Sequence, residues 1–297
     1  MQTFAPIVLF VYNRPEHTAR TIKFLRQNEL AQESRLFIFS DGPKSPEDDE
    51  KVLEVRTFLK TVDGFKSVKV IESTENQGLA QSVISGASEV LEKYQKVIVL
   101  EDDLLTSNDF LNFMNFALDA YRDEPRVFSV SGYSYPLAPL KSYPYSAYFS
   151  HRGSSWSWGI WLDRWQTIDW EIQGDFINNK AQQQAFNKTC GPDLSNMLIK
   201  HLNGKIDSWA IRFAYNAFIQ DKLHVLAAKN KVKNIGHDNT GTHSPKTTKY
   251  DVPLIAEDKY TFPEIAAPEV RLKNAIIKFH TKNFIVRLIR MIIPLKK

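Results

Sequence analysis

The chain has 297 residues, 43% of them hydrophobic and 24% charged, which is the composition of a soluble globular protein with a sizeable core. Its formal net charge of +4 comes from residues 270–297, which contain eight Lys or Arg and no acid, so the preceding body has 30 basic and 34 acidic residues. This balance excludes a basic body that binds nucleic acid, and the single cysteine, Cys190, excludes an intramolecular disulfide.

The N-terminal residues, the length of the apolar runs and the single cysteine together predict the cellular location. The N-terminal residues lack the basic leader of a secretory signal, and no apolar run reaches the roughly 18 residues of a membrane-spanning helix. Since a lone cysteine fits a reducing compartment, the sequence predicts a cytoplasmic protein.

The first 133 residues alternate between apolar runs and helical patterns. Strands are predicted at 6–12, 36–39, 68–71, 97–100 and 127–130, with amphipathic helices between them. This alternation predicts an α/β fold with a mostly parallel sheet flanked by helices. Ligands bind such sheets at the carboxyl ends of the strands. Three groups of polar residues fall at those ends: Asn13 with Arg14, Asp41, and the acids from Glu101 to Asp103.

The stretch VIVLEDDLL places Glu101, Asp102 and Asp103 directly after the fourth strand. Three adjacent like charges raise one another's pKa, and a divalent cation, Mn²⁺ or Mg²⁺, would relieve the repulsion. The alternative is an acidic helix N-terminus that complements the helix dipole. A metal site is favoured because the acids abut a buried strand several residues before the next helix, which is expected to begin near Asn108.

From about residue 134 the pattern changes to prolines and aromatic residues, with four tryptophans between Trp156 and Trp165. Helices are predicted over 181–203 and 208–222, and the i, i+4 spacing of Trp161 and Trp165 predicts a buried helical stripe. We expect residues 1–133 and residues 134–268 to be two halves of one domain, the second of which completes the crevice at the strand ends. Residues 269–297 are expected to form a basic amphipathic tail.

Several separated motifs resemble those of the GT-A glycosyltransferases. EDD resembles their D-x-D-type metal motif, and Asn76-Gln77-Gly78-Leu79 resembles the N-x-G and helix of family 2. VIVLEDDLLTSNDFLNFM, VFSVSGY, WGIW and IDSWAIR are similar in order and spacing to the N-acetylglucosaminyltransferase I type. The resemblance covers roughly residues 5–245. It implies a GT-A fold and inverting transfer from a nucleotide-diphospho-sugar.

The resemblance also implies roles for donor-side residues. Asp103 would be the direct metal ligand, Glu101 and Asp102 would contact ribose or sugar hydroxyls, and Asp41 would accept from the uracil N–H. From its own chemistry, the fork of Arg14, beside Asn13, suits a diphosphate. Simpler interpretations remain open: a surface arginine, an Asx turn at Asp41, and ordinary helix-entry residues at Asn76 and Gly78.

In the second half, IDSWAIR keeps the D-x-W-x-x-R of the family's base element, which implies that Asp207 is the general base. Ser208 stands where the second acid is expected, and an N-cap is the alternative role for Asp207. We expect Asp207 to be partly buried beside Trp209, which would raise its pKa toward neutrality. Reserve candidates are Asp169, Glu171 and Asp175.

Two further groups in this half are candidates for binding. Trp156 and Trp158 offer flat faces to a sugar, although tryptophans at this density usually belong to a core. His243, ahead of His237, would be a third metal ligand by the resemblance, the alternative being a solvated loop histidine.

The tail combines an apolar face with eight basic residues, which predicts a helix lying on an anionic membrane surface. The alternative is a terminal helix docked on the protein. The complete prediction is an inverting, metal-dependent glycosyltransferase at the inner face of the membrane. It would move a sugar from a UDP-sugar to a glycan or lipid-linked acceptor in surface polysaccharide assembly. A sugar-nucleotide nucleotidyltransferase is disfavoured, because VYNRPEH lacks the glycine-rich triphosphate loop. A non-catalytic sugar-nucleotide-binding module is the other alternative.

Overall fold

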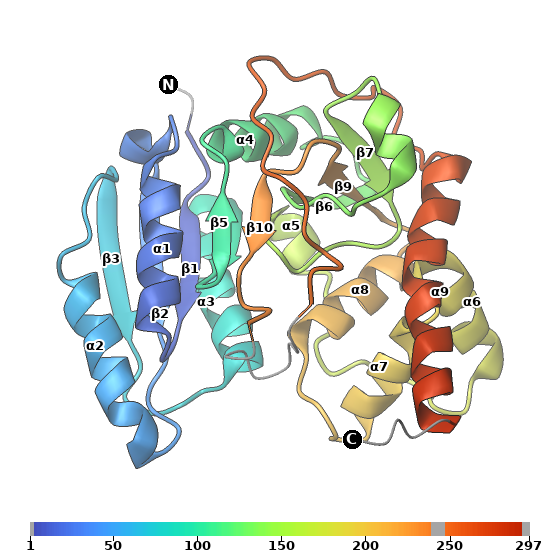
Figure 1. Cartoon of the computed structure of the whole chain (residues 1–297), viewed down its shortest axis with the longest axis horizontal. Coiled ribbons are helices and arrows are strands. Elements are labelled where there is room, and N and C mark those ends of the chain that lie inside the picture. The colour runs from blue at the N-terminus through green and yellow to red at the C-terminus, as the bar shows by residue number, and fades with distance from the viewer. Residues whose placement is uncertain (1–2, 239–246, 293–297) are drawn as a thin grey trace.

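The structure, a computed structural model, describes residues 3–238 and 247–292, with side chains up to residue 281 (Figure 1). Within these residues, one sheet has eight strands in the order β3-β2-β1-β4-β8-β6-β9-β7, and β10 pairs with β5 in a separate ribbon. The strands are β1 (Ile7–Val11), β2 (Arg35–Ser40), β3 (Ser67–Glu72), β4 (Lys96–Glu101), β5 (Leu104–Thr106), β6 (Val127–Ser131), β7 (Ala147–Ser150), β8 (Trp158–Trp161), β9 (Leu223–Ala227) and β10 (Val232–Asn234).

The helices cover both faces of the sheet. They are α1 (Pro15–Arg26), α2 (Asp49–Leu59), α3 (Leu79–Tyr94), α4 (Phe110–Ala120), α5 (Leu162–Trp165), α6 (Lys180–Cys190), α7 (Leu194–Leu202), α8 (Trp209–Ile219) and α9 (Val270–Ile292). Short 3₁₀ helices are η1 (Ala31–Glu33), η2 (Pro46–Asp48) and η3 (Ala138–Ser142).

The predicted α/β fold with a mostly parallel sheet is confirmed. Strand β1 pairs in parallel with β2 and β4, and β2 pairs in parallel with β3. Because Val11 pairs with Ser40 and Phe10 pairs with Glu101, the carboxyl ends of β1, β2 and β4 lie at the same edge. Asp41, which follows β2, and the acids from Glu101 to Asp103, at the end of β4, therefore lie at this edge.

Two apolar layers sandwich this sheet. Alternate residues of β1 point to opposite faces, so Ile7 and Leu9 pack with α1, α2 and α4, whereas Val8 and Phe10 pack with α3 and α8. All five residues of β1 are buried, which explains why its sequence is a continuous apolar run instead of an alternating one.

Both predicted halves contribute to one sheet, because β8 inserts between β4 and β6 and is antiparallel to both. This strand corrects the predicted tryptophan stripe: Trp161 ends β8, and only Trp165 lies on the short helix α5. The i, i+4 spacing was misleading because WGIW is a short apolar run, and periodicity alone does not separate a buried strand from a buried helix in such a run.

The predicted helix over 181–203 is two helices. Gly191 has a φ of 135°, a conformation that L-residues rarely adopt, and Pro192 follows it, so α6 ends at Cys190 and α7 begins at Leu194. The helix predicted over 208–222 is α8, and the side chain of Ser208 caps it by accepting from the N–H of Ile211.

The first turns of α9 pack on the body of the protein. Leu272 and Ile276 are buried and join an apolar cluster with Tyr133, Tyr148 and Leu226. These two side chains are part of a core, which is what the alternative of a terminal helix docked on the protein predicts for the first turns of the tail. The remaining apolar side chains of the expected membrane face, from Phe284 onward, lie outside the described residues. No helix in the described ranges combines the length and the apolarity that crossing a bilayer requires.

Candidate active site

The three acids lie at the carboxyl edge of the sheet. Glu101 is the last residue of β4, and Asp102 and Asp103 form the turn into β5. Asp102 is 4% exposed and Asp103 is 8% exposed, so neither is an ordinary surface acid. The hydroxyl of Thr21, on α1, donates to the carbonyl oxygen of Asp102 at 2.7 Å and fixes the turn against that helix.

Burial and mutual repulsion raise the pKa values of two of these acids. Burial first, and then the charges of Asp103 and Asp102, raise the pKa of Glu101 to about 8. Burial raises the pKa of Asp102 to about 6, although the charge of Arg14 opposes this rise. Near neutral pH the Glu101 carboxyl is therefore mostly protonated, and a cation bound beside these acids would favour their ionised forms.

Arg14 supplies one cation from the chain itself. Its Nη2 pairs with Asp102 Oδ1 and lies 3.1 Å from Asp103 Oδ2, while its Nε donates to Asp102 Oδ2 at 3.3 Å. Burial lowers the pKa of Arg14, but the two carboxylates raise it more, so the guanidinium stays charged. Arg14 therefore lies at the predicted site, and its guanidinium contacts the carboxylates of Asp102 and Asp103.

The side chain of Asn13 contacts Asp48 and is not among the groups that contact the three acids. Its amide Nδ2 donates to Asp48 Oδ1 at 2.6 Å, and the hydroxyl of Tyr12 donates to Asp48 Oδ2 at 2.9 Å. These hydrogen bonds lower the pKa of Asp48, which lies in η2. Sequence reasoning missed Asp48, because an acid at the start of a helix is usually explained by the helix dipole.

Asp41, at the end of β2, contacts the loop of Asn76 and Gly78, which the N-x-G motif singled out. Asp41 accepts from the N–H groups of Gln77 and Gly78 at 2.8 and 3.0 Å, and Asn76 Nδ2 donates to the carbonyl oxygen of Gly42 at 2.8 Å. Gly78 has a φ of 75°, which favours glycine. Asp41 also accepts from the N–H of Gly42, the next residue, so the contact to the residue two positions on that defines an Asx turn is not the one formed here. The carboxylate therefore shapes the loop that leads into α3.

A late segment, residues 234–237, lies on the acids and was missed as such by sequence reasoning. The N–H of Ile235 donates to the carbonyl oxygen of Asp103 at 2.8 Å, and Asn234 Nδ2 donates to Asp103 Oδ1 at 3.2 Å. Gly236 is so close that a β-carbon there would overlap Asp103 Oδ2. The only local signal was a glycine within a loop-like stretch.

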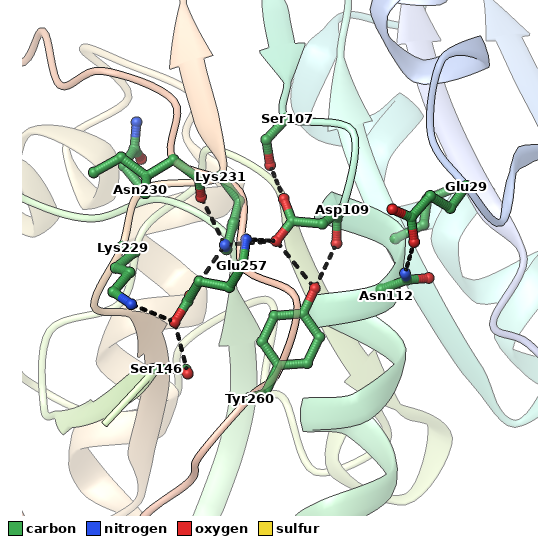
Figure 2. A network of polar contacts seen from close by, with 12 residues as sticks. Glu29, Ser107, Asp109, Asn112, Ser146, Lys229, Asn230, Lys231, Glu257 and Tyr260 are labelled. Atoms are coloured by element: carbon green, nitrogen blue, oxygen red, sulfur yellow. Dashed lines mark hydrogen bonds and ion pairs between the residues drawn. The ribbon is translucent and has the colours of Figure 1, made fainter. Parts of the chain in front are cut away.

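The segment that includes Gly236 is held by a buried charge network at the start of β10 (Figure 2). Lys231 is fully buried, and its Nζ donates to Asp109 Oδ2 and to the carbonyl oxygen of Ile255, both at 2.7 Å. The same Nζ lies 3.1 Å from Glu257 Oε2. Since β10 pairs with β5, which directly follows the acids, this network fixes the strand that leads to residues 234–237.

His237 directly follows Gly236, the residue that lies against Asp103. Its ring stacks on Tyr250, with centroids 5.7 Å apart, and meets the edge of Trp156 at 5.3 Å. Both ring nitrogens are buried, and neither has a hydrogen-bond partner. The preferred candidate, His243, lies outside the described residues. In the part of the chain that the structure describes, no three His, Cys, Asp or Glu side chains gather into a ready metal-binding group.

The sequence profile of Glycosyl transferase family 2 matches residues 7–188, which are more than half of the chain. The match includes the parallel strands β1 to β4. The chain belongs to glycosyltransferase family 2. This confirms the family 2 and GT-A resemblance, whereas the finer resemblance to the N-acetylglucosaminyltransferase I type stays a prediction. No curated protein gives a significant match.

Two solved structures are similar to this chain at low sequence identity. One is the mannosyltransferase PcManGT from Pyrobaculum calidifontis in complex with GDP-Man and Mn²⁺, with 13% identity, coverage of 72% of this chain and 74% of that chain, and a TM-score of 0.39. Another is residues 1–349 of TarS from S. aureus, with 11% identity, coverage of 78% and 61%, and a TM-score of 0.38.

In this family 2 glycosyltransferase the profile match ends at residue 188 and does not reach Asp207. Asp207 lies two residues before α8. The Asp207 side chain is 69% exposed, and Arg212 Nη2 lies 3.0 Å from its Oδ1. The expected partial burial beside Trp209 is therefore wrong, and the N-cap role belongs to Ser208.

The reserve acids do not join the edge. Asp169 accepts from the N–H groups of Ile172 and Gln173, and Asp175 accepts from Asn178, so both carboxylates stabilise local turns. Glu171 is exposed.

The two platform tryptophans of the glycosyltransferase differ in exposure. Trp158 is 1% exposed and stacks on Trp165, with centroids 5.5 Å apart and an interplanar angle of 11°. Its predicted role as a sugar platform is therefore corrected to that of a core residue, because both neighbouring strands of β8 and the aromatic cluster cover it. Trp156 is half-buried and lines a cavity.

Proposed function

We propose that this family 2 glycosyltransferase is metal-dependent and inverting, and that it transfers a sugar from a UDP-sugar to a glycan or lipid-linked acceptor in surface polysaccharide assembly. One observation carries the proposal: Arg14 and the acids Glu101, Asp102 and Asp103 meet in a buried cluster at the carboxyl edge of the sheet. Asp41 and the loop at Gly78 lie at the end of the neighbouring strand.

The residues at this edge fit a divalent cation. Carboxylate oxygens are ligands that Mg²⁺ and Mn²⁺ accept, and imidazole is also a transition-metal ligand. Asp103 and His237 would hold the ion together with the donor diphosphate, and support comes from the two buried, unpartnered nitrogens of His237. When bound, the metal would supply Lewis-acid stabilisation of the leaving diphosphate.

The side chains around Asp103 would bind and orient the donor. The Arg14 fork, which stays charged, suits two phosphate oxygens. Glu101 and Asp102 would meet ribose or sugar hydroxyls. Asp41 would face the base, and the hydrogen bonds of its carboxylate to the loop at residues 76–78 would place that loop beside the nucleotide.

Asp207 is the proposed base. Its carboxylate would take the proton from the acceptor hydroxyl as that oxygen bonds to the anomeric carbon. The bond from the anomeric carbon to the diphosphate oxygen breaks on the opposite side, which inverts the configuration. Exposure of 69% leaves the carboxylate open to an acceptor. Positioned proton transfer of this kind contributes about 10²- to 10⁴-fold to a rate.

We propose further that the protein works at the inner face of the membrane. The support is the eight basic residues of the last 28 positions, each worth about 1 kcal/mol near an anionic leaflet. Because Leu272 and Ile276 dock on the body, the proposed membrane-contacting part is the residues that follow them, which include six of the eight basic residues.

The decisive experiment measures UDP release from a panel of nucleotide sugars, with and without Mn²⁺, by the wild type, Asp103→Asn and Asp123→Asn. Asp123 is an exposed acid outside the cluster and serves as the matched control. We expect Mn²⁺-stimulated release by the wild type and the control only, with Mn²⁺-dependent donor binding lost in Asp103→Asn. Unchanged donor affinity of that variant in calorimetry with Mn²⁺ would reject the metal site. Donor binding without turnover on any acceptor would favour the non-catalytic module.

A further inference from the structure

A cavity of about 210 Å³ lies in the second half of the molecule. Segments far apart in the sequence line it: the stretch from Arg152 to Trp156, the first turns of α8, and residues of α7, β9 and α9. Its aromatic lining residues are Tyr133, Tyr135, Trp156, Trp209, Phe213 and Tyr250. His280 of α9 lines the same cavity as the first turns of α8, so the C-terminal helix contributes to its wall.

The cavity adjoins the proposed active site on two sides. Trp156 and Tyr250 line it, and the ring of His237, the residue after Gly236, packs against both. Trp209 also lines it, two residues after Asp207. The wall of the cavity is therefore shared with the segment on Asp103 and with the start of the helix that carries the proposed base.

Two histidines give the lining unused hydrogen-bonding capacity. His224 is 1% exposed and His280 is 5% exposed, and the Nε2 atom of each has no hydrogen-bond partner. Burial lowers the pKa of both to about 3, so both imidazoles are neutral at physiological pH. A buried polar atom without a partner costs about 1–3 kcal/mol. A ligand hydroxyl matches a neutral imidazole in either tautomer, because a hydroxyl both donates and accepts.

The charge of the lining argues against an anionic ligand. Arg152 is the one lining residue of permanent charge among those described. Its Nη1 and Nη2 bind Asp193 Oδ1 and Oδ2 at 2.8 and 2.9 Å, so the guanidinium is already compensated by a bidentate carboxylate. A phosphate or carboxylate would have to displace Asp193.

The volume limits the ligand to about one ring. A cavity of about 150 Å³ accepts benzene, whereas sites for drug-sized ligands have about 300–1,000 Å³. An aromatic lining with a few polar groups suits a ligand that has both apolar C–H faces and hydroxyls. We propose that this cavity binds one uncharged sugar ring of the acceptor, an inference that rests on the proposed function and names its acceptor class.

The test uses methyl glycosides of glucose, galactose, mannose and N-acetylglucosamine as probes, without donor or metal, with binding followed by saturation-transfer NMR and tryptophan fluorescence. Ala214→Phe fills the cavity from α8, and His280→Phe keeps a ring but removes the unpartnered nitrogen. The control is His151→Phe, because His151 also has a buried, unpartnered Nδ1 but is outside the lining. We expect at least one glycoside to bind, with affinity reduced at least tenfold in both cavity variants and unchanged in the control.

Three outcomes overturn the inference: no glycoside binds, neither cavity variant changes the affinity, or methyl glucuronide or cyclohexane binds more tightly than every neutral glycoside. Circular dichroism of each variant shows whether it is folded. If one cavity variant is unfolded, the affinity of the other cavity variant decides the test. UDP release by a protein that binds no glycoside rejects the cavity proposal and leaves the proposed function intact. Glycoside binding by a protein that binds no nucleotide sugar retains the sugar site and rejects the proposed function.

Discussion

Gly236 lies directly against the carboxylate of Asp103. A β-carbon at position 236 would overlap Asp103 Oδ2 and come within 3.1 Å of Arg14 Nη1. The segment after β10 can therefore cover the acids only because residue 236 has no side chain. This contact links the last part of the domain to the acids at the end of β4.

The first prediction concerns this contact. Gly236→Ala is expected to destabilise the protein by about 1–3 kcal/mol, the usual range for overpacking, and to abolish Mn²⁺-dependent donor binding because Asp103 must move. Thermal unfolding and calorimetry measure the two effects. In the Asp103→Ala background the stability cost should disappear, since the overlapping carboxylate is gone. An equal cost in both backgrounds would place the strain elsewhere.

The second prediction separates chemistry from capping at the start of α8. Asp207→Asn should keep donor affinity and slow transfer by about 10²- to 10⁴-fold. The Asp207 end of its ion pair with Arg212 is exposed, and Asn keeps an oxygen that can accept from that guanidinium, so little stability should be lost. Ser208→Ala is the matched variant: it removes the cap, lowers stability by about 1 kcal/mol and leaves the chemistry intact. Near-normal turnover of Asp207→Asn on its acceptor means that another group is the base.

The third prediction concerns the buried network in Figure 2. Lys231→Met should destabilise the protein by about 3–5 kcal/mol, because Asp109 and Glu257 lose the cation buried between them. Lys229→Met is the control, since Lys229 also contacts Glu257 but its side chain is 49% exposed. We expect a change of at most about 1 kcal/mol for the control. Similar urea midpoints for both variants would show that burial does not govern this network.

The fourth prediction concerns α9. A chain ending at Glu269 loses Leu272 and Ile276, whose burial contributes about 1.5–3 kcal/mol each, and should unfold at a markedly lower temperature than the full chain. A chain ending at Thr281 keeps both residues and should remain as stable as the full chain.

Vesicle binding distinguishes the membrane role from this docking role. If residues 282–297 contact the membrane, the chain ending at Thr281 loses binding to anionic vesicles at low salt while its unfolding temperature is retained. Equal vesicle binding by that chain and the full chain would contradict a membrane-binding end.

The sequence by itself determined the parallel half of the fold and its edge. Apolar runs of β-branched residues predict buried strands, and polar residues directly after such runs must lie where the strands emerge. Asp41 and Glu101–Asp103 were found in this way, because strand, strand end and acid are neighbours in the chain. Gly78 was found by its place in the N-x-G motif.

Tertiary packing decided what depends on distant partners. Asn234 and Asp103, which share a hydrogen bond, are 131 residues apart, and no local pattern reports such a contact. Trp161 lies in a strand because it pairs with Lys96 of β4, and Ser208 instead of Asp207 caps α8. The docking of Leu272 depends in the same way on a surface formed by η3, β7 and β9. Periodicity shows which side chains are apolar, but only the assembled fold determines what covers them.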